Sequence, residues 1–514
     1  MNPRNRILAI ICIMLSSLCS CGVMSNMMAY NVTLNDKTPL TQQIIYKNAR
    51  YIVKQDFDLR GSDLSIPAGC TLKFDGGCFR NGSLKGDCTV VVLEQDEPAF
   101  DNVIMSGSFT AKEFPINAYK TKKLDYFYNF LEAFSGTDLY LAGDYTVTDY
   151  LGLSDGATPQ RLHIDGKGHK MSLYSFGAYK VGDCVIKDIT IEATNNITPK
   201  NKWKSDKFNF GIVGSFDKSV LELENVTFTK ECNFAYLRGF KKLEVSNCKE
   251  IGSYFFVYDC NDVDFHNNSI EDAANGYYSI GRMTEAGQVK IYDNVFRNIS
   301  GGGAILSGGL KYNVSICKNV FDRVGGGGAM KSCINIHPRG EINLRNNRIV
   351  VNEGAASLDI DAARAELYSD ATTVRVENNE IECVEGDNTM HSIALVGLAR
   401  LYFKNNTVKN QKFFFWDTPY MEFTDNTMTF TADLGRSAEI GSMSTHETTE
   451  GKEYHHIYRN NVYNLPATKG AAHIRYQSKV TVRIVGKGNT YSHPVDFVDQ
   501  YKKFEASGDI KICK

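Results

Sequence analysis

The sequence predicts an all-β solenoid, in which short parallel strands coil repeatedly around one core. A phrase of the form apolar-x-apolar-x-polar-Asn-x-apolar recurs eight times at intervals of about 28 residues. Within each copy, apolar and polar residues alternate with a period of two, as expected for a strand with one buried face. The 43 glycines and 11 prolines suit a turn-rich β protein. Neither a leucine-rich pattern nor a helical period accompanies the repeat.

The repeated phrase has an asparagine at its centre, where the alternation is interrupted. The shared residues are Asn268, Asn294, Asn319, Asn347, Asn379, Asn406, Asn426 and Asn461. Asparagine tolerates the left-handed conformation, and its side chain bonds to nearby backbone, so a bend is predicted there. Coils about 4.8 Å apart would bring each amide to the next, forming an Asn ladder. Two earlier phrases carry Asn225 and Asn247 one position sooner.

This pattern resembles the right-handed parallel β-helices of the pectate-lyase superfamily over roughly residues 140–490. The resemblance implies a right-handed single-stranded parallel β-helix solenoid whose coils share a saccharide-binding sheet. Upstream, KKLDYFYNFLEAF places Leu124, Phe127, Leu131 and Phe134 on one helical face. A helix before the first regular strand resembles the short N-terminal capping helix of such proteins. An end cap is expected because an uncovered parallel sheet exposes reactive edges.

The first 21 residues resemble an export signal. Arg4 and Arg6 precede the apolar stretch ILAIICIML, which is too short to span a bilayer. LCSC resembles a lipobox, so Cys21 is predicted to be lipidated and to attach the protein to the outer membrane, as in lipoproteins of gut Bacteroidetes. The membrane face is left open. The predicted parts are a signal peptide (1–20), a tether (21–50), N-terminal β-coils (51–115), a capping-helix segment (116–137), the main β-helix (138–495) and a C-terminal cap (496–514).

Charge and cysteine content narrow the range of partners. The net charge of −2 argues against a nucleic acid as a main partner. No paired-cysteine or Cys/His spacing typical of a metal site occurs, so no cofactor is expected, apart from calcium if the protein is a lyase. Cysteines in or beside the predicted strands are expected to be buried thiols. A polysaccharide or other glycan is the expected partner, and the sequence leaves the oligomeric state open.

The alternation also predicts which side chains point outward from the coil. In CINIHPR (333–339) the outward residues are Asn335 and His337, and in SLDIDAAR (357–364) they are Asp359 and Asp361. Carboxylates two residues apart on a strand have Cα atoms roughly 6–7 Å apart, and the neighbouring strand would bring His337 to about 5 Å from one of them. Asp359, Asp361 and His337 are therefore the predicted catalytic residues.

Further polar and aromatic residues near the same predicted surface are candidates for substrate binding. They are Asn335, Arg339, Arg364, Trp416, Asp417, Asp259, Asp272, Tyr277 and Arg282. Among these, Asp272 follows Glu271 in a turn, which makes an alternative carboxylate pair near Tyr277 and Arg282. Aromatic rings stack on sugars, but they also stack on each other inside such coils.

Three functions are compatible with this arrangement. A glycoside hydrolase would use the two carboxylates as acid and as base or nucleophile. A polysaccharide lyase would need a base such as His337 or Lys331 and a cation, calcium or arginine, to neutralise a uronate. A non-catalytic saccharide-binding or adhesin-like lipoprotein would use the surface alone. Fold does not decide among them, because function lies in sites placed on folds.

Overall fold

The computed structural model describes residues 30–149, 156–194, 208–216, 218–229, 232–281, 284, 286–308, 312–325, 332–362, 372–384, 393–431, 439–445, 453–466, 471–478, 480–501 and 504–513. The chain forms two compact units, one comprising residues up to Thr121 together with Tyr126–Thr137 and the other comprising Lys122–Asp125 and Asp138 onward. The predicted signal peptide and Cys21 lie outside the described residues.

The first unit is a parallel sheet of eight strands with short helical segments. The strands of this sheet are β1 (Asn31–Thr33), β2 (Arg50–Val53), β3 (Phe57–Asp58), β4 (Asp63–Ser65), β5 (Thr71–Phe74), β6 (Phe79–Leu93), β7 (Phe100–Thr110) and β9 (Tyr119–Lys120). The other elements are β8 (Phe114–Pro115), α2 (Leu40–Gln43), the 3-10 helix η1 (Ile116–Ala118) and α3 (Leu124–Ala133), whose first two residues belong to the second unit.

Helix α3 lies within the segment predicted to be helical. Phe127 and Leu131 are fully buried, as the predicted apolar face requires. Its aromatic residues pack within the first unit, where Phe130 stacks on Tyr119 with ring centroids 4.5 Å apart. Phe134, just after the helix, lies 4.6 Å from Phe114 by the same measure.

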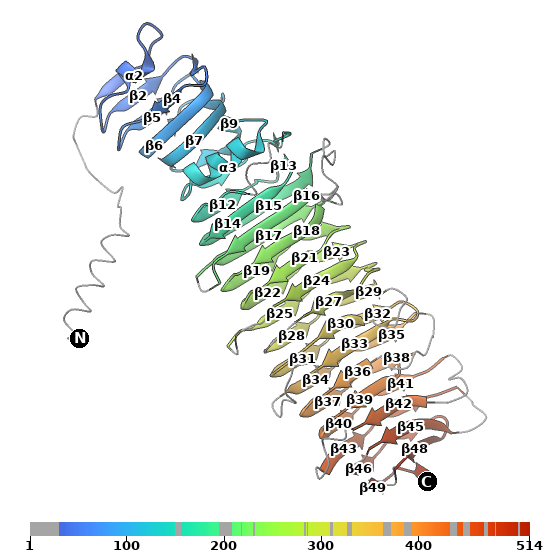
Figure 1. Ribbon diagram of the computed structural model, residues 1–514. Coiled ribbons are helices and arrows are strands. Elements are labelled where there is room, and N and C mark those ends of the chain that lie inside the picture. The colour runs from blue at the N-terminus through green and yellow to red at the C-terminus, as the bar shows by residue number, and fades with distance from the viewer. Residues whose placement is uncertain are drawn as a thin grey trace, which may run out of the picture. The chain divides into compact units, whose positions relative to one another are not determined.

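The second unit is nearly all parallel strands in stacked sheets, an arrangement consistent with a parallel β-helix (Figure 1). Each full coil contributes one strand to each of three faces. The first face is a 14-stranded parallel sheet. Its strands are β14 (Phe176–Val181), β16 (Phe208–Gly214), β18 (Cys232–Arg238), β21 (Phe255–Tyr258), β24 (Asn275–Ile280), β27 (Gly303–Ser307), β30 (Ser332–Ile336), β33 (Ala356–Asp361), β36 (Ile393–Val396), β39 (Phe413–Trp416), β42 (Glu439–Ser444), β45 (Ala472–Gln477), β48 (Val495–Asp499) and β50 (Ile512–Cys513).

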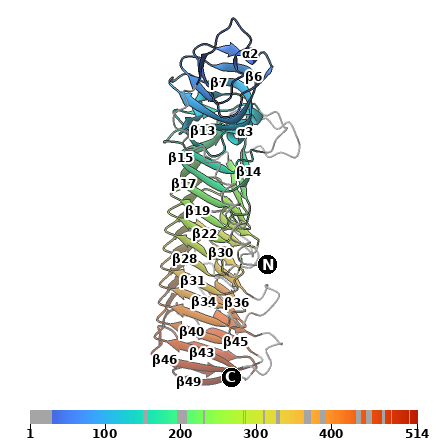
Figure 2. The ribbon, with the colours of Figure 1, turned by 90° about the vertical axis from the view of Figure 1, so that its left-hand side faces the viewer.

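The second face follows the first along the chain and is visible as a separate column of strands in Figure 2. It contains β10 (Asp138–Tyr140), β12 (Arg161–Asp165), β15 (Asp183–Ala193), β17 (Val220–Phe228), β19 (Lys242–Ser246), β22 (Asp262–His266), β25 (Val289–Tyr292), β28 (Val314–Cys317), β31 (Glu341–Arg345), β34 (Thr373–Glu377), β37 (Arg400–Lys404), β40 (Tyr420–Thr424), β43 (Glu453–Arg459), β46 (Thr481–Lys487) and β49 (Phe504–Gly508). Strands β49 and β50 continue the same pairing within the segment predicted as a C-terminal cap.

The third face completes each coil with short strands. They are β11 (Tyr145–Thr146), β13 (Lys170–Leu173), β20 (Lys249–Ile251), β23 (Ser269–Glu271), β26 (Val295–Arg297), β29 (Val320–Val324), β32 (Arg348–Val351), β35 (Glu380–Cys383), β38 (Thr407–Lys409), β41 (Thr427–Thr429), β44 (Val462–Asn464) and β47 (Thr490–Tyr491). The long strands β15 and β17 extend into this face as well.

The bend between the second and third faces has two positions with different roles. The first takes a positive φ, as at Asn267 (55°) and Asn346 (57°). The second carries the repeated asparagine, which is buried and hydrogen-bonded to the next coil. The repeated asparagine is therefore not the left-handed residue, in contrast to the sequence-based expectation. The distinction explains the early phrases, since Asn225 and Asn247 occupy the left-handed position, with φ of 52° and 55°.

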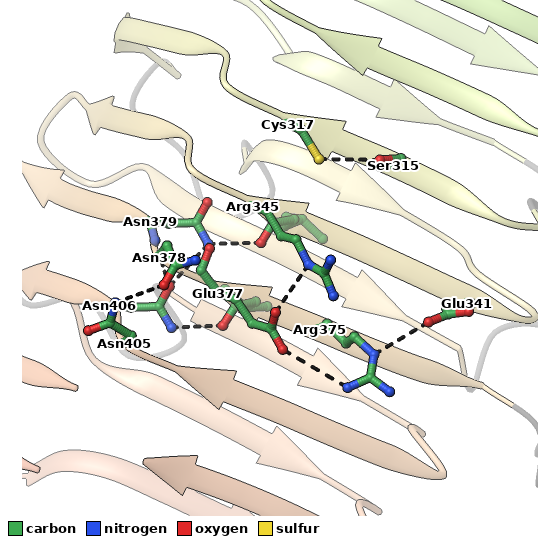
Figure 3. Close-up of polar contacts among 12 residues, drawn as sticks. Ser315, Cys317, Glu341, Arg345, Arg375, Glu377, Asn378, Asn379, Asn405 and Asn406 are labelled. Carbon is green, nitrogen blue, oxygen red and sulfur yellow. Dashed lines mark hydrogen bonds and ion pairs between the residues drawn. The ribbon is translucent and has the colours of Figure 1, made fainter. Parts of the chain in front are cut away.

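The buried asparagines form a continuous row of hydrogen bonds, called here the asparagine row. Asn379 donates from its backbone N–H and from Nδ2 to Oδ1 of Asn406, at 2.9 and 3.0 Å, and also from Nδ2 to the Leu344 carbonyl (Figure 3). The same pattern joins Asn268, Asn294, Asn319, Asn347, Asn379, Asn406, Asn426, Asn461 and Asn489 in sequence. Each amide thus satisfies backbone groups that the bend would otherwise leave unpaired.

The core of the second unit consists of stacked apolar residues from successive coils. Phe403 and Phe423 are parallel, with ring centroids 5.0 Å apart, and Phe296 and Phe321 have the same spacing. Identical side chains recur at one register position, so each coil repeats the packing of the previous one. Of the predicted buried strand cysteines, four are buried and Cys317 is partly exposed.

Candidate functional site

The outer surface of the first face is built from alternate residues of its strands. Ile334, Ile336, Leu358 and Ile360 are at most 1% exposed and face the core. Asn335, His337, Asp359 and Asp361 are half-buried and face outward. The alternation predicted for these two strands is therefore confirmed, and it brings the predicted polar residues to one surface.

Adjacent strands place the predicted site residues in contact. Asn335 is aligned with Asp359, and its Nδ2 donates to Oδ2 of that carboxylate at 2.9 Å. His337 Nδ1 lies 3.2 Å from the carbonyl oxygen of Asp361. Because a carbonyl can only accept, Nδ1 is the donor in this contact.

One row of outward residues runs straight across seven coils and is called here the central row. Its members, each aligned with the next, are Phe256, Tyr278, Leu306, Asn335, Asp359, Ala394 and Phe414. With strands about 4.8 Å apart, the row spans about 29 Å. An amide and a carboxylate thus lie between aromatic residues at both ends, and Ala394 leaves a small side chain beside the carboxylate.

The aromatic end of this row belongs to a larger group, called here the aromatic patch. The patch comprises Phe234, Tyr236, Tyr254, Phe256, Tyr258 and Tyr278, all half-buried. Phe256 and Tyr278 stack with ring centroids 5.0 Å apart and planes 13° apart, and Tyr236 lies 5.4 Å from Phe256. Because the Phe256 and Tyr278 rings face each other across coils, they present edges rather than faces to solvent. The tyrosines add neutral hydroxyl groups to this surface.

Trp416 lies outward on β39, aligned with Val396, and its ring centroid is 6.3 Å from that of Phe414. Asp361 is aligned with the same Val396 from the other side. Trp416 is therefore two coils from Asp361 on one surface, as predicted. Tyr277 is different: it is 2% exposed, and its ring packs 5.3 Å from Phe265 in the core. Its proposed contact with substrate is therefore wrong, and the outward residue is Tyr278.

Three of the predicted acidic residues, Asp417, Asp259 and Asp272, have interaction partners within the protein. Asp417 is 5% exposed and accepts a hydrogen bond from the Tyr454 hydroxyl at 3.4 Å, so a substrate cannot reach it directly. Asp259 pairs with Arg238 at 3.9 Å. Asp272 is exposed at a left-handed position (φ 54°), where its carboxylate accepts from Asn298 Nδ2 at 2.9 Å. Arg339 is half-buried in the turn after β30. Arg282 and Arg364 lie outside the described residues.

A second charged cluster, near the last coils, was not predicted. Glu439, His473 and Asp496 share one register position on β42, β45 and β48. Arg475 pairs with Glu439, and Lys511 Nζ lies 3.4 Å from Asp496 Oδ1. The register shifts between Glu439 and Gly441, which breaks the alternation that locates outward residues. The pairing of these charges across coils is visible only once the strands are aligned.

The outer surface of the second face carries ion pairs between neighbouring coils rather than a candidate site. Figure 3 shows Arg345 paired with Glu377 and Arg375 paired with Glu341, at 3.1 and 3.4 Å. The guanidinium of Arg375 also lies 4.2 Å above the Tyr402 ring. Charges engaged in this way on an exposed sheet contribute modestly to stability.

Glu250 and His456 are titratable groups that are buried away from the outer surface. Glu250 on β20 is fully buried, and burial raises its pKa to about 8, against a smaller opposing effect of the Ser253 hydroxyl. His456 on β43 is 2% exposed, and burial lowers its pKa to about 4. Its Nε2 donates to the Thr418 carbonyl at 2.8 Å, and Nδ1 lies 3.3 Å from the Tyr476 hydroxyl. A neutral ring satisfies both contacts.

Within the described ranges, no three His, Cys, Asp or Glu side chains come together in a way that would hold a metal ion. In the same part of the chain, no helix combines the length and apolar character needed to cross a bilayer. Comparison with known proteins found no matching family model, no matching curated protein and no matching solved structure.

Proposed function

We propose that this protein is an exported, carbohydrate-active right-handed parallel β-helix protein that binds a glycan along the central row. In this proposal the asparagine row serves as the ladder that fixes the register of the coils. The observation that carries the proposal is the order of side chains on one outer surface. Asn335 and Asp359 lie between the aromatic patch and the Phe414–Trp416 pair.

The chemistry of this row matches the chemistry of a saccharide. Sugars combine hydroxyl groups with apolar C–H surfaces, and ligand sites generally combine apolar walls with a few placed polar groups. Asn335 can donate and accept, and the Asp359 carboxylate is an acceptor for hydroxyls. A row of about 29 Å is long enough for an oligosaccharide rather than a single sugar.

The binding test is affinity measurement on a glycan panel with surface variants. Phe256→Ala and Asn335→Ala are expected to weaken binding, and Ala394→Arg is expected to block the row sterically. Tyr402→Ala is the matched control, because Tyr402 is an outward aromatic residue on the second face. Equal loss of binding in the control, or no loss in the three variants, would contradict the proposed surface.

Glycoside hydrolysis is the second candidate, favoured by two outward carboxylates on one strand. Asp359, already an acceptor for the Asn335 amide, would take a proton from water as the water oxygen bonds to the anomeric carbon. Asp361 would donate a proton to the glycosidic oxygen as its bond to that carbon breaks. The sum is one glycosidic bond and one water converted into two hydroxyl-bearing products.

Product analysis separates the three functions considered from the sequence. A hydrolase generates reducing ends only, a lyase generates an unsaturated product that absorbs in the ultraviolet, and a pure binder generates neither. Asp359→Asn and Asp361→Asn are each expected to lower hydrolysis at least a hundredfold. Unchanged turnover in both variants would exclude this carboxylate pair. Repeating the assay with a chelator tests the calcium that a lyase would need.

We further propose that Cys21 carries the lipid that attaches the protein to the outer membrane. The lipobox-like LCSC at residues 18–21 supports this. Labelling with a radioactive fatty acid should modify the wild type and not Cys21→Ser, and the variant should leave the membrane fraction. Labelling that persists in the variant would place the anchor elsewhere.

A further inference from the structure

We infer that the first unit carries a surface for lipid headgroups, called here the membrane patch, made by Tyr30, Ile45 and Tyr46. The inference rests on the proposed attachment through Cys21 and adds a second contact with the same membrane. Among the described residues these three have the most exposed large apolar side chains, at 61%, 55% and 48%. Ile45 is next to Tyr46 in the chain, and the Tyr30 and Tyr46 rings meet edge to face with centroids 4.8 Å apart. A single exposed apolar residue is ordinary, whereas a contiguous group is typical of an interaction surface.

Buried groups hold the membrane patch in a defined shape. Tyr51 on β2 is fully buried, and its hydroxyl accepts from the Tyr46 N–H at 2.8 Å and donates to the Tyr46 carbonyl at 2.9 Å. Tyr30 is fixed from the same strand, because the Arg50 N–H donates to its carbonyl at 2.9 Å. The backbone beside the patch is thus bonded to β2, while its apolar side chains stay exposed. A surface whose shape is set before binding loses little conformational freedom when it binds.

The membrane patch lies close to the proposed anchor along the chain. Residues 22–29 separate Cys21 from Tyr30, which makes nine residue steps. Because an extended chain spans at most about 3.6 Å per residue, a lipid on Cys21 would keep Tyr30 within roughly 32 Å of the bilayer surface. So short a tether gives the patch a high effective concentration of lipid, and a contact that is weak by itself becomes sufficient. This position favours a membrane over a soluble protein as the occupant.

The residue types also suit the interface of a bilayer. Tyrosine combines an apolar ring with a hydroxyl and is enriched where acyl chains meet headgroups. Isoleucine adds apolar surface that can enter the acyl boundary. Lys47 directly follows Tyr46, Arg50 is bonded to Tyr30 through its backbone, and both of these cationic side chains are exposed. Cations beside a bilayer are attracted to anionic headgroups, so charge and apolar contact favour the same occupant.

The test is flotation of the chain from residue 21 onward, carrying Cys21→Ser, with vesicles of phosphatidylethanolamine and phosphatidylglycerol. Lipid is supplied at millimolar concentration, which is what a short tether provides. Residues 1–20 are left out because the proposed export signal is absent from the mature protein, and its apolar stretch would itself bind lipid. The chain with an intact patch is expected to float with the vesicles. The triple variant Tyr30→Ser, Ile45→Ser, Tyr46→Ser is expected to bind at least about tenfold more weakly.

A matched triple variant removes exposed apolar side chains from the second unit. Val384→Ser, Val485→Ser, Tyr501→Ser is expected to leave vesicle binding unchanged. The double variant Lys47→Gln, Arg50→Gln tests the charges. Its binding to the phosphatidylglycerol vesicles should fall roughly fivefold for each charge, and its binding to phosphatidylcholine vesicles should not change. Urea unfolding of every variant verifies that the fold is retained.

Fluorescence quenching reports contact with lipid directly. Tyr46→Trp adds an indole to the patch, and brominated acyl chains are expected to quench it beyond the quenching of the two native tryptophans. Tyr501→Trp, in the second unit, is expected to show no added quenching.

Equal vesicle binding by the intact chain and the patch variant, or no binding by the intact chain, would overturn this inference. Loss of self-association in the patch variant, with vesicle binding unchanged, would overturn it in favour of a second copy as the occupant. Failure of Cys21 to acquire a lipid would overturn the proposed anchor, whereas patch-dependent binding of the Cys21→Ser chain would still support the membrane patch.

Discussion

Replacing the buried Glu250 with glutamine is expected to change how stability depends on pH. Glu250 is fully buried and aligned between Phe228 and Ile270, so its charged form is strongly disfavoured in the folded chain. Its pKa is about 8, against an ordinary value of 4.5. Glutamine has nearly the same shape and cannot ionise, so the variant isolates the effect of the proton.

The sign follows from the raised pKa. The folded state holds the proton more tightly than the unfolded state, so the stability associated with Glu250 is complete below pH 4.5 and is lost as pH rises toward 8. One pH unit in this window costs about 1.4 kcal/mol. The wild type should therefore lose about 3 kcal/mol between pH 4.5 and 7, and about 4 kcal/mol by pH 8, relative to Glu250→Gln.

The assay is urea unfolding of the wild type and of Glu250→Gln at several pH values. The result is the difference between their free energies of unfolding at each pH. Because a long stack of parallel strands can unfold in segments, hydrogen exchange of the amides in β20 and β23 provides a local measure. Glu224→Gln is the matched control, since Glu224 faces outward on the preceding coil. A difference between wild type and Glu250→Gln that stays constant from pH 4.5 to 8 would refute the reasoning.

Three further predictions address the same coils. His456 has a lowered pKa of about 4, so its stabilising contribution is present above pH 6.5 and is lost as pH falls toward 4. In the same unfolding assay, the wild type should lose about 3 kcal/mol of unfolding free energy over that range relative to His456→Asn. Asn319→Ala removes the acceptor of two buried N–H groups of Asn294, so the free energy of unfolding measured in urea should fall by about 2–5 kcal/mol. Asn405→Ala, at an exposed bend position, is the control and should lower it by less than half as much. Lys318→Gly places glycine at a left-handed position (φ 57°) and should raise stability by about 0.5–1 kcal/mol, and a lowered unfolding midpoint would contradict this.

The general architecture was predictable because the repeat records it in every coil. The period of two identified strands, and the recurring asparagine identified where successive coils align. The left-handed position was not separable from the row position by sequence alone, because both often hold asparagine, as in Asn267 and Asn268. The early phrases are the clue: Asn247 keeps the left-handed position while Cys248 takes the row position.

The orientation of the candidate site residues was predictable only where the alternation of apolar and polar residues allowed one choice of the side that faces the core. In β30 and β33, isoleucine and leucine mark the inward side, so Asp359 and Asp361 could be oriented. In β24, Tyr277 and Tyr278 are adjacent and chemically identical, and only alignment of Tyr277 with the buried Phe255 shows which one faces the core. The cluster at Glu439 was missed because its contacts join separate coils across an irregular register.

The hydrogen bonds that join one asparagine of the row to the next all run in one direction, whereas Nδ2 also donates to a backbone carbonyl of the preceding coil, as from Asn379 to Leu344. Each residue of the row donates to the side-chain oxygen at the same position in the following coil, beginning with the Cys248 backbone N–H and ending at Asp509, which accepts two hydrogen bonds from Asn489 at 2.8 and 3.1 Å. Amide dipoles aligned head to tail polarise one another, so the row has a polarity along the coil axis. A carboxylate at the accepting end meets the donors with a full negative charge. The row therefore ends in an anion, and the side chain of Asp509 has no N–H with which to continue the same hydrogen bonds to an amide of a further coil.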